Sequence, residues 1–259
     1  MLASRELDFA AAKKRIVSFI ERRTSSAGAD GAVLGLSGGV DSAVTAYLTV
    51  EALGSRRVMA LIMPDLRVTP QVDVSDAKEV AEELDVEARM IDITPIHRAF
   101  MKGLVQNRLA EGNLRARIRM ALLYYYANSQ NRIVVGTGDR SEALVGYFTK
   151  YGDGGVDILP IGDLYKTEVR KLGEVLGVDR RIITKRSSPR LWPGQTAEGE
   201  LGAGYEVIDD ILRLHVDQKK GAGETAARLG IKTDEVMLVL GRLERSAHKR
   251  RKPEVCKVH

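Results

Sequence analysis

Residues 35–42 read Gly35-Leu36-Ser37-Gly38-Gly39-Val40-Asp41-Ser42, and they join an apolar run, residues 32–36, to a segment with helical spacing, residues 40–48. The pattern predicts a strand, a tight turn and the start of a helix. Glycines let backbone N–H groups approach a ligand, and the two serine hydroxyls and the helix dipole add further attraction for an anion. The stretch therefore predicts a phosphate site at the carboxyl edge of a parallel sheet, with a nucleotide as the ligand.

The segments around this turn alternate between strand and helix patterns. Strands are expected at residues 57–64, 86–93 and 132–137, and helices at residues 7–25, 70–84, 95–105 and 113–128, the last capped by Asn113. Such alternation predicts an α/β fold, a doubly wound parallel sheet with helices on both faces. Helices are also expected from Thr167 and from Tyr205 onward. We expect one domain over residues 1–259.

The composition excludes several classes of protein. Lys and Arg outnumber Asp and Glu by 40 − 35 = 5, which suits an anionic substrate but does not require nucleic acid. The single cysteine, Cys256, excludes an internal disulfide or a CxxC site, and His97, His215 and His259 have no partners at informative spacing. No apolar run approaches the roughly 20 residues of a membrane span, and the residues around Arg5 lack a signal-peptide core. A cytoplasmic protein with no membrane or nucleic-acid partner is expected.

Two other phosphate motifs fit less well. The turn lacks the lysine of a Walker loop, and the second turn, residues 136–142, has Ser141 where the dinucleotide fingerprint has its third glycine. The alternative for the first turn is that its glycines serve only tight packing. Residues 146–166 are too glycine-rich for regular structure, and residues 187–196 break every periodicity, as a mobile lid does. Trp192 in that lid is either a packing residue or part of the site.

The sequence Ser37-Gly38-Gly39-Val40-Asp41-Ser42 resembles the signature of the ATP pyrophosphatases, which split ATP between its α and β phosphates. With it, further motifs over residues 37–249 resemble those of one family, the ammonia-dependent NAD synthetases. They are Gly112 to Met120, Gly136-Thr137 with Ser141-Glu142, Phe148 to Asp153, Leu159-Pro160 with Lys166, Leu191 to Thr196 with Glu200-Leu201-Gly202, and His248-Lys249.

This resemblance implies an adenine-nucleotide alpha-hydrolase-like fold and a set of site residues. ATP is implied at Gly35, Leu36, Ser37, Gly38, Gly39, Val40, Asp41, Ser42, Thr137, Lys166 and Ser188, and Mg²⁺ at Asp41 and Glu142. Deamido-NAD is implied at Arg117, Lys150, Asp157, His248 and Lys249. We also suggest that Asp153 binds ammonium or accepts its proton. The implied catalytic residues are thus Asp41, Glu142, Lys166 and Asp153.

Each of these assignments has a plainer alternative. Asp41 and Glu142 could be carboxylates that only complement helix dipoles, and Lys166 could be a surface lysine, although a cation is unfavourable at a helix start. Arg117 could belong to a solvated helix face, and Asp153 could be a solvated loop residue. The resemblance further implies a homodimer whose interface includes helices within residues 94–128.

The reaction implied is the amidation of deamido-NAD with ammonia through an adenylate, giving NAD, AMP and pyrophosphate. Glutamine-using relatives carry an extra hydrolase domain with a cysteine nucleophile, so ammonia is the expected nitrogen source here. One rival is another ATP pyrophosphatase that adenylates a substrate such as tRNA, although such enzymes generally use paired cysteines. The other is a non-catalytic nucleotide-binding or nucleic-acid-binding module, which steeply salt-dependent binding would support.

Overall fold

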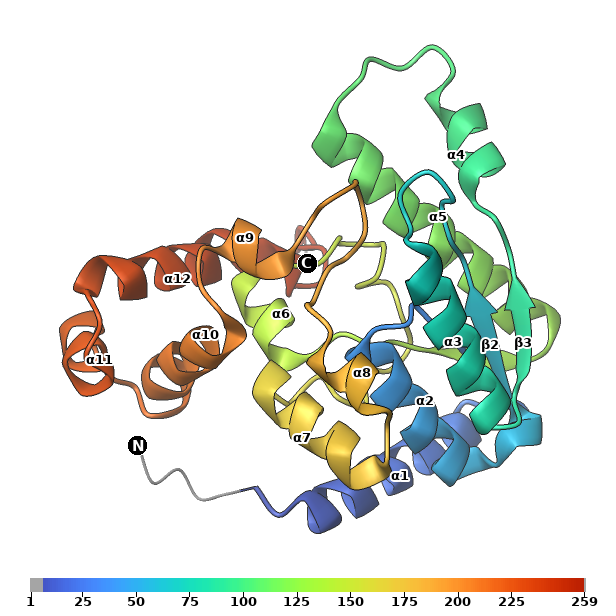
Figure 1. Ribbon diagram of the computed structural model, residues 1–259, viewed down its shortest axis with the longest axis horizontal. Coiled ribbons are helices and arrows are strands. Elements are labelled where there is room, and N and C mark those ends of the chain that lie inside the picture. Colours follow the sequence, from blue (N-terminus) through green and yellow to red (C-terminus); the bar gives the residue numbers. More distant parts are fainter. Residues whose placement is uncertain (1–6, 259) are drawn as a thin grey trace.

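Four parallel strands form one sheet in the computed structural model, which describes residues 7–258 (Figure 1). They are β1 (Gly31–Gly35), β2 (Val58–Ile62), β3 (Glu87–Met90) and β4 (Arg132–Val135), and they lie in the order β3-β2-β1-β4. Ala32 pairs with Val58 on one side and with Ile133 on the other. The parallel sheet expected from the sequence is confirmed.

Helices and helical turns occupy most of the remaining chain. The α-helices are α1 (Phe9–Ser26), α2 (Val40–Leu53), α3 (Gln71–Glu83), α4 (Thr94–Met101), α5 (Arg108–Ser129), α6 (Arg140–Val145), α7 (Lys166–Leu176), α8 (Arg180–Thr184), α9 (Ala197–Leu201), α10 (Tyr205–Leu212), α11 (Ala222–Leu229) and α12 (Thr233–Arg245). Short helical turns lie at Ser55–Arg57, Arg213–Asp217 and Ala247–Lys249. None of the described helices is both long and apolar enough to cross a membrane.

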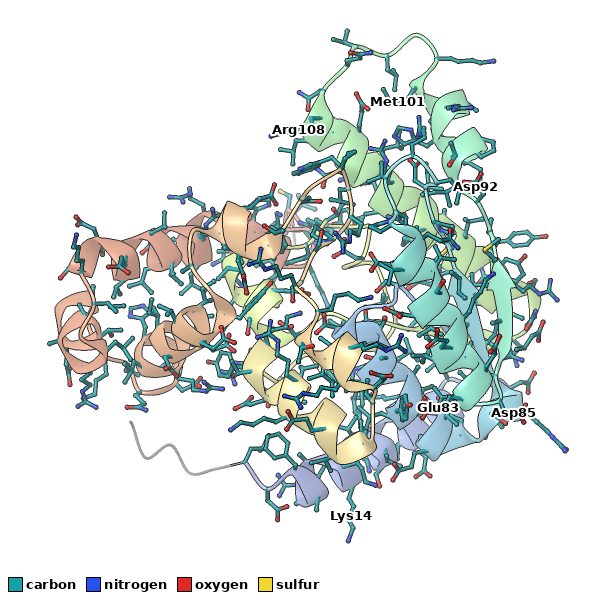
Figure 2. The ribbon with its side chains drawn as sticks, in the orientation of Figure 1. Lys14, Glu83, Asp85, Asp92, Met101 and Arg108 are labelled. Atoms are coloured by element: carbon teal, nitrogen blue, oxygen red, sulfur yellow. The ribbon has the colours of Figure 1, made fainter. Side chains whose placement is uncertain are left out.

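Alternate residues of β1 separate the core into two layers, because successive side chains of a strand point to opposite faces. Ala32 and Leu34 pack with residues of α1, α2, α3 and α7, whereas Val33 packs with Ile118 and Ala127 of α5. Charged side chains such as Lys14, Glu83 and Asp85 point away from these layers into solvent (Figure 2). Helices therefore cover both faces of the sheet, as the doubly wound fold requires.

The C-terminal helices form a third apolar cluster beside the sheet (Figure 1). Val145 of α6 and Tyr165, which precedes α7, belong to this cluster together with Tyr205, Ile208 and Val239 from later in the chain. Since α6 contacts α7 and α7 packs against α1 and α2, the cluster is joined through them to the helical layer that covers the sheet.

The order of the strands places a crevice between β1 and β4. The chain leaves β1 toward β2 on one side, while β4 pairs on the other side, so the two strands flank a switch in strand order. Ligands of open α/β sheets bind outside the carboxyl ends of the strands at such a point. The turns at residues 36–39 and 136–139 both begin there.

Two local expectations need revision. Asn113 does not cap a helix: α5 begins five residues earlier at Arg108, and its N-cap is Asn107, whose Oδ1 accepts a hydrogen bond from Ala110 N at 2.9 Å. Gly112 lies inside this helix, where a side chain would press on Leu191 and Trp192. Within the irregular residues 146–166, Ile158 pairs with Val135 and extends the sheet edge.

The described residues omit two ends of the chain. Residues 1–6, on which part of the argument against a signal peptide rests, lie outside them, and so does His259, which was interpreted as a structural or surface residue.

Candidate active site

The turn after β1 is held by its own two serines. Ser37 Oγ and Ser42 Oγ lie 3.0 Å apart, Ser42 Oγ donates a hydrogen bond to Gly39 O at 2.9 Å, and Ser37 N donates to Ser42 Oγ at 3.2 Å. Gly38 has a φ of 75°, and a Cβ there would lie 2.2 Å from Asp73 O. The turn therefore requires glycine at position 38.

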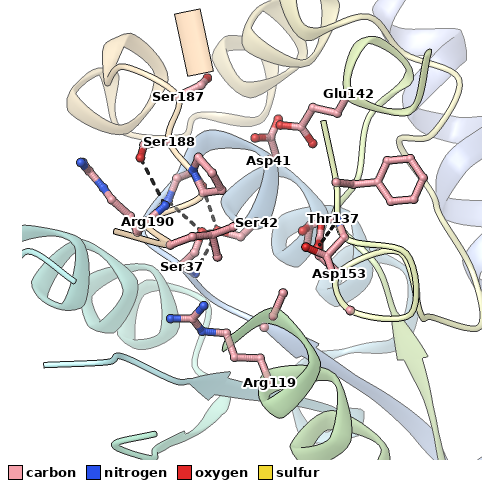
Figure 3. A pocket seen from close by; sticks show the side chains of 18 of the residues that line it. Ser37, Asp41, Ser42, Arg119, Thr137, Glu142, Asp153, Ser187, Ser188 and Arg190 are labelled. Atoms are coloured by element: carbon pink, nitrogen blue, oxygen red, sulfur yellow. Dashed lines mark hydrogen bonds between the residues drawn. The ribbon is translucent and has the colours of Figure 1, made fainter. Parts of the chain in front are cut away.

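A cavity of about 360 Å³ opens at this turn, over the carboxyl ends of β1, β2 and β4 (Figure 3). Seven of the eight residues of the quoted stretch line it, all except Gly38, whose carbonyl accepts a hydrogen bond from Lys185 Nζ. Of the other residues singled out from the sequence, the cavity lining includes Thr137, Glu142, Asp153, Ser188 and Lys249.

Beside the turn, one lysine lies among three carboxylates. Lys166 Nζ is 2.7 Å from Asp41 Oδ2, 2.7 Å from Asp139 Oδ2 and 2.9 Å from Glu142 Oε1. The Lys166 side chain is 0% exposed, so it is not the surface lysine of the plainer interpretation. Three acidic groups around one ammonium leave an excess of negative charge at the edge of the cavity, which Asp41 and Glu142 line and the buried Lys166 and Asp139 do not.

Asp139 is the member of this cluster that the sequence did not reveal. Its Oδ1 accepts a hydrogen bond from Glu142 N at 2.8 Å and thereby caps α6, while its Oδ2 contacts Lys166. An aspartate three residues before a glutamate is a helix-start pattern, and this signal was available.

Burial and charge act in opposite directions on these groups. Burial and the nearby carboxylates raise the pKa of Glu142 and of Asp139, although Lys166 opposes both shifts. Burial alone would lower the pKa of Lys166, but its three acidic neighbours raise it well above the ordinary value. Lys166 therefore stays protonated and is held in place by charge-assisted hydrogen bonds.

The segment of residues 187–196 covers one side of the cavity. Arg190 Nε donates to Asp73 Oδ2 at 2.8 Å, and Arg115 Nη1 donates to Leu191 O at 3.1 Å. The Ser188 hydroxyl donates to Gln195 O at 2.7 Å, so it braces the segment internally as well as lining the cavity. Trp192 also lines the cavity, and the Arg108 guanidinium lies 5.0 Å from its ring centroid.

Comparison with known proteins decides the family. The sequence profile of the NAD synthase family matches residues 12–253. The chain belongs to this family. It is therefore a ligase that forms a carbon–nitrogen bond.

Individual members of the NAD synthase family are similar over nearly their whole length. The chain is 53% identical to an NH₃-dependent NAD⁺ synthetase of Archaeoglobus fulgidus, over 97% of this chain and 98% of the relative. Among solved structures, an NH₃-dependent NAD synthetase from Campylobacter jejuni is 32% identical with a TM-score of 0.83, covering 97% of this chain and 100% of that one. An NMN synthetase from Francisella tularensis is 36% identical with a TM-score of 0.86. The match covers 97% of this chain and 99% of that one.

The residues assigned to the dinucleotide by family resemblance lie in two places. Lys249 lines the cavity, and its Nζ donates to Gly146 O and Phe148 O, each at 2.8 Å. Arg117, Lys150 and His248 lie outside the lining and are linked in a row: Arg117 Nη2 donates to Lys150 O at 3.3 Å, and Lys150 Nζ donates to His248 O at 2.9 Å.

Asp157 makes hydrogen bonds that hold parts of the fold together in this member of the NAD synthase family. Its carboxylate accepts hydrogen bonds from Val134 N at 2.7 Å and from Tyr124 Oη at 2.9 Å, and it does not line the cavity. Asp153, by contrast, lines the cavity, and its Oδ1 accepts a hydrogen bond from Thr149 N at 2.9 Å. Desolvation by the surrounding protein raises the pKa of Asp153, although hydrogen bonds to its carboxylate and the charge of Lys249 oppose the shift.

The acidic cluster fits a divalent cation. Oxygen atoms of Asp41, Asp139 and Glu142 all lie within 4.8 Å of one another, and Asp41 Oδ1 is buried without a hydrogen-bond partner among the described residues. Carboxylate oxygens beside a phosphate site are the ligands that Mg²⁺ uses. The cluster thus offers a buried acceptor and surplus negative charge at the edge of the phosphate turn.

Proposed function

We propose that this enzyme amidates deamido-NAD with ammonia at the expense of ATP, forming NAD, AMP and pyrophosphate. The observation that carries the proposal is that the phosphate turn with Asp41, Glu142 of the acidic cluster, Asp153 and Lys249 all border one cavity. The names of similar proteins support the substrate: two relatives at 53% and 51% identity over nearly their whole length are NH₃-dependent NAD⁺ synthetases.

The reaction has two steps. A carboxylate oxygen of the nicotinate attacks the α-phosphorus of ATP, the bond from that phosphorus to the oxygen leading to the β-phosphate breaks, and pyrophosphate leaves. Ammonia then attacks the carbonyl carbon of the adenylate, the bond from that carbon to the AMP oxygen breaks, and the nitrogen loses a proton. Asp153 lines the cavity, and we propose that it binds ammonium or takes that proton.

The protein contributes position and charge. The turn at residues 35–42 and Thr137 bind the ATP phosphates, and Ser188 bounds them from the lid. Lys166 stabilises charge on the departing pyrophosphate. Holding the two anionic substrates in line turns a bimolecular encounter into a unimolecular one, and fixed positive charge offsets their repulsion.

We propose Asp41 and Glu142 as the residues that hold Mg²⁺, with Asp139 as a neighbouring carboxylate. When bound, Mg²⁺ neutralises phosphate charge and acts as a Lewis acid. Lys166 would then share its carboxylate partners with the ion, since the same side chains contact its ammonium group.

A homodimer is proposed on the strength of an exposed apolar surface. Phe100, Leu104, Val105, Leu109 and Tyr125 are between 57% and 91% exposed, and all lie on α4, α5 or the connection between them. This connection, between Met101 and Arg108, projects from the rest of the molecule (Figures 1 and 2). Exposed apolar surface of this kind marks an interaction site, and residues 94–128 contain all of it.

We further propose that Arg117, Lys150, Asp157 and His248 serve the dinucleotide at the outer end of the site, that the chain is one domain and that the enzyme is cytoplasmic. The row of contacts from Arg117 through Lys150 to His248 supports a shared role for these residues outside the cavity.

The test is the purified protein with ATP, Mg²⁺ and deamido-NAD, supplied with either ammonium or glutamine. The proposal predicts NAD, AMP and pyrophosphate with ammonium, more rapidly at alkaline pH where free ammonia is abundant, and little product with glutamine. A parallel reaction with nicotinate mononucleotide is warranted by the similarity to an NMN synthetase. Preference for the mononucleotide, or cleavage of ATP only with tRNA, would contradict the proposed substrate.

A further inference from the structure

Arg119 is a cation in the cavity wall that none of the assignments above uses. It lies on α5, and its Nε donates a hydrogen bond to Met63 O at 2.9 Å, one residue beyond the end of β2. Among residues 7–258 this is its only side-chain hydrogen bond. Its guanidinium points into the cavity toward Ser37, which leaves both terminal nitrogens available to a ligand (Figure 3).

Arg119 differs from two of the other basic residues that line the cavity. Lys185 and Arg190 also line it, but each is paired with the carboxylate of Asp73 at 3.0 Å and 2.8 Å. The described residues place no carboxylate within 4.0 Å of the Arg119 guanidinium. These ion pairs exclude Lys185 and Arg190 as free anion binders. Arg119, Arg186 and Lys249 have no carboxylate within 4.0 Å among the described residues. Lys249 is already assigned to the dinucleotide, and Arg119 points toward Ser37 of the phosphate turn (Figure 3).

A partly buried guanidinium with no carboxylate beside it is unfavourable unless an anionic ligand binds to it. Burial lowers the pKa of Arg119 to about 10, whereas the charges of Asp65 and Asp153 oppose that shift. The guanidinium therefore remains protonated at neutral pH. A planar fork of N–H donors with two free nitrogens matches the two oxygens of a carboxylate or two phosphate oxygens.

The position of Arg119 favours a carboxylate over a phosphate as its ligand. The phosphate turn already offers backbone N–H groups and hydroxyls for ATP. Lys166 contacts Asp41 and Glu142, which lie across the cavity from Arg119 (Figure 3). Arg119 instead borders the part of the cavity that Gly152 and Asp153 also line. A carboxylate held there would be next to both the phosphate turn and the residue proposed to handle ammonia.

We propose that Arg119 binds the nicotinate carboxylate of deamido-NAD and orients one of its oxygens toward the α-phosphorus. This inference rests on the proposed function and names the residue that recognises its reacting group. It also explains how product is distinguished from substrate: the amide of NAD carries no charge, so the contact with Arg119 weakens once the reaction is complete.

The decisive experiment compares two ligands that differ only at this group. Deamido-NAD and NAD are titrated calorimetrically, without ATP, into the wild-type protein, Arg119→Met, Arg119→Lys and the control Arg22→Met, whose residue is exposed on α1. An ATP analogue that cannot be cleaved between the α and β phosphates is titrated with Mg²⁺ in parallel. The analogue also reports whether each variant retains a folded phosphate site.

The wild type should prefer deamido-NAD to NAD, and Arg119→Met should reduce that preference by roughly tenfold or more, as expected for a charge-assisted contact. Its affinity for NAD and for the ATP analogue should hardly change, and Arg119→Lys should retain part of the preference. Equal losses for both dinucleotides would overturn the inference, and so would a loss confined to the ATP analogue, which would assign Arg119 to the α-phosphate. If the wild type binds neither dinucleotide, the proposed function fails and the inference with it.

Discussion

Lys166 Nζ lies 2.7 Å from Asp41 Oδ2, and this contact joins two residues 125 positions apart, one in the first turn of α2 and one at the first position of α7. A lysine at a helix start opposes the helix dipole. The three carboxylates around it compensate for that position. The contact therefore ties the phosphate turn to the segment that follows the glycine-rich residues 146–165.

Lys166→Met should lower the turnover number more than it raises the Michaelis constant for ATP. The reason is that the proposed partner of its ammonium is charge that develops on pyrophosphate during the reaction. Steady-state kinetics with ATP as the varied substrate measures both constants. Lys171→Met, which alters an exposed lysine of the same helix, is the matched control and should behave as wild type. A pure affinity defect for ATP would refute the role.

Asp41→Asn and Glu142→Gln should each remove most of the turnover while leaving the helical circular dichroism unchanged. Each substitution removes one carboxylate proposed to hold Mg²⁺ at nearly constant volume, and about 2 kcal/mol or more of transition-state stabilisation is the expected loss. Binding of Mn²⁺ in the presence of ATP, followed by paramagnetic resonance, should weaken in the same variants. Glu174→Gln alters an exposed carboxylate on α7 and serves as the control, which should behave as wild type. Near-normal turnover in both variants would remove the metal assignment.

Asp65→Asn should destabilise the fold in a pH-dependent way. Burial alone would raise the pKa of Asp65, but hydrogen bonds from Arg67 and Arg115 outweigh it and hold the pKa far below its ordinary value. Because the pKa is depressed in the folded state, this stabilisation is complete above the unfolded pKa of about 4 and is lost as the pH falls further.

Urea unfolding at several pH values checks this expectation. At neutral pH the variant should lose about 3 kcal/mol, since Arg115 would remain buried without its partner. The difference from wild type should shrink as the pH falls below about 4. A difference that is constant with pH would mean that the ion pairs of Asp65 contribute nothing to the acid stability.

The paired substitution Phe100→Glu with Val105→Glu should convert the proposed dimer to a monomer and reduce activity. Both residues belong to the exposed apolar surface, at 57% and 91% exposed, and carboxylates there would be buried without partners in an interface. Sedimentation velocity measures the change. Met237→Glu, on the exposed side of α12, is the control that should leave the assembly intact. A wild-type protein that sediments as a monomer would contradict the proposal.

The sequence predicted best those features that depend on neighbouring residues. The strand, turn and helix around Gly38 follow from local pattern, and so does the irregular segment after Gly146. Side-chain direction was harder to foresee. Arg117 and Arg119 are two positions apart on a helix, so they point to nearly opposite sides. Only the fold shows that Arg119 is the one that lines the cavity.

The remaining features could not be predicted from the sequence because they depend on contacts between distant parts of the chain. Asp139 joins Lys166 because β4 brings the end of the second turn beside the first, and nothing within residues 136–142 indicates that partner. Likewise the requirement for glycine at position 112 comes from Leu191 and Trp192, almost 80 residues later in the chain, which lie against it. Asp157, proposed to serve the dinucleotide, also accepts hydrogen bonds from Val134 N and Tyr124 Oη, which its place in the sequence does not indicate.

The measurement that bears most directly on the account is the fate of oxygen from the substrate carboxylate. Deamido-NAD labelled with ¹⁸O in the nicotinate carboxylate is converted with ATP and ammonium, and the products are analysed by mass spectrometry and by the ³¹P isotope shift. Attack of that carboxylate on the α-phosphorus predicts one labelled oxygen in AMP and none in pyrophosphate. Unlabelled AMP, or ADP and labelled inorganic phosphate in its place, would contradict activation of the substrate as an adenylate.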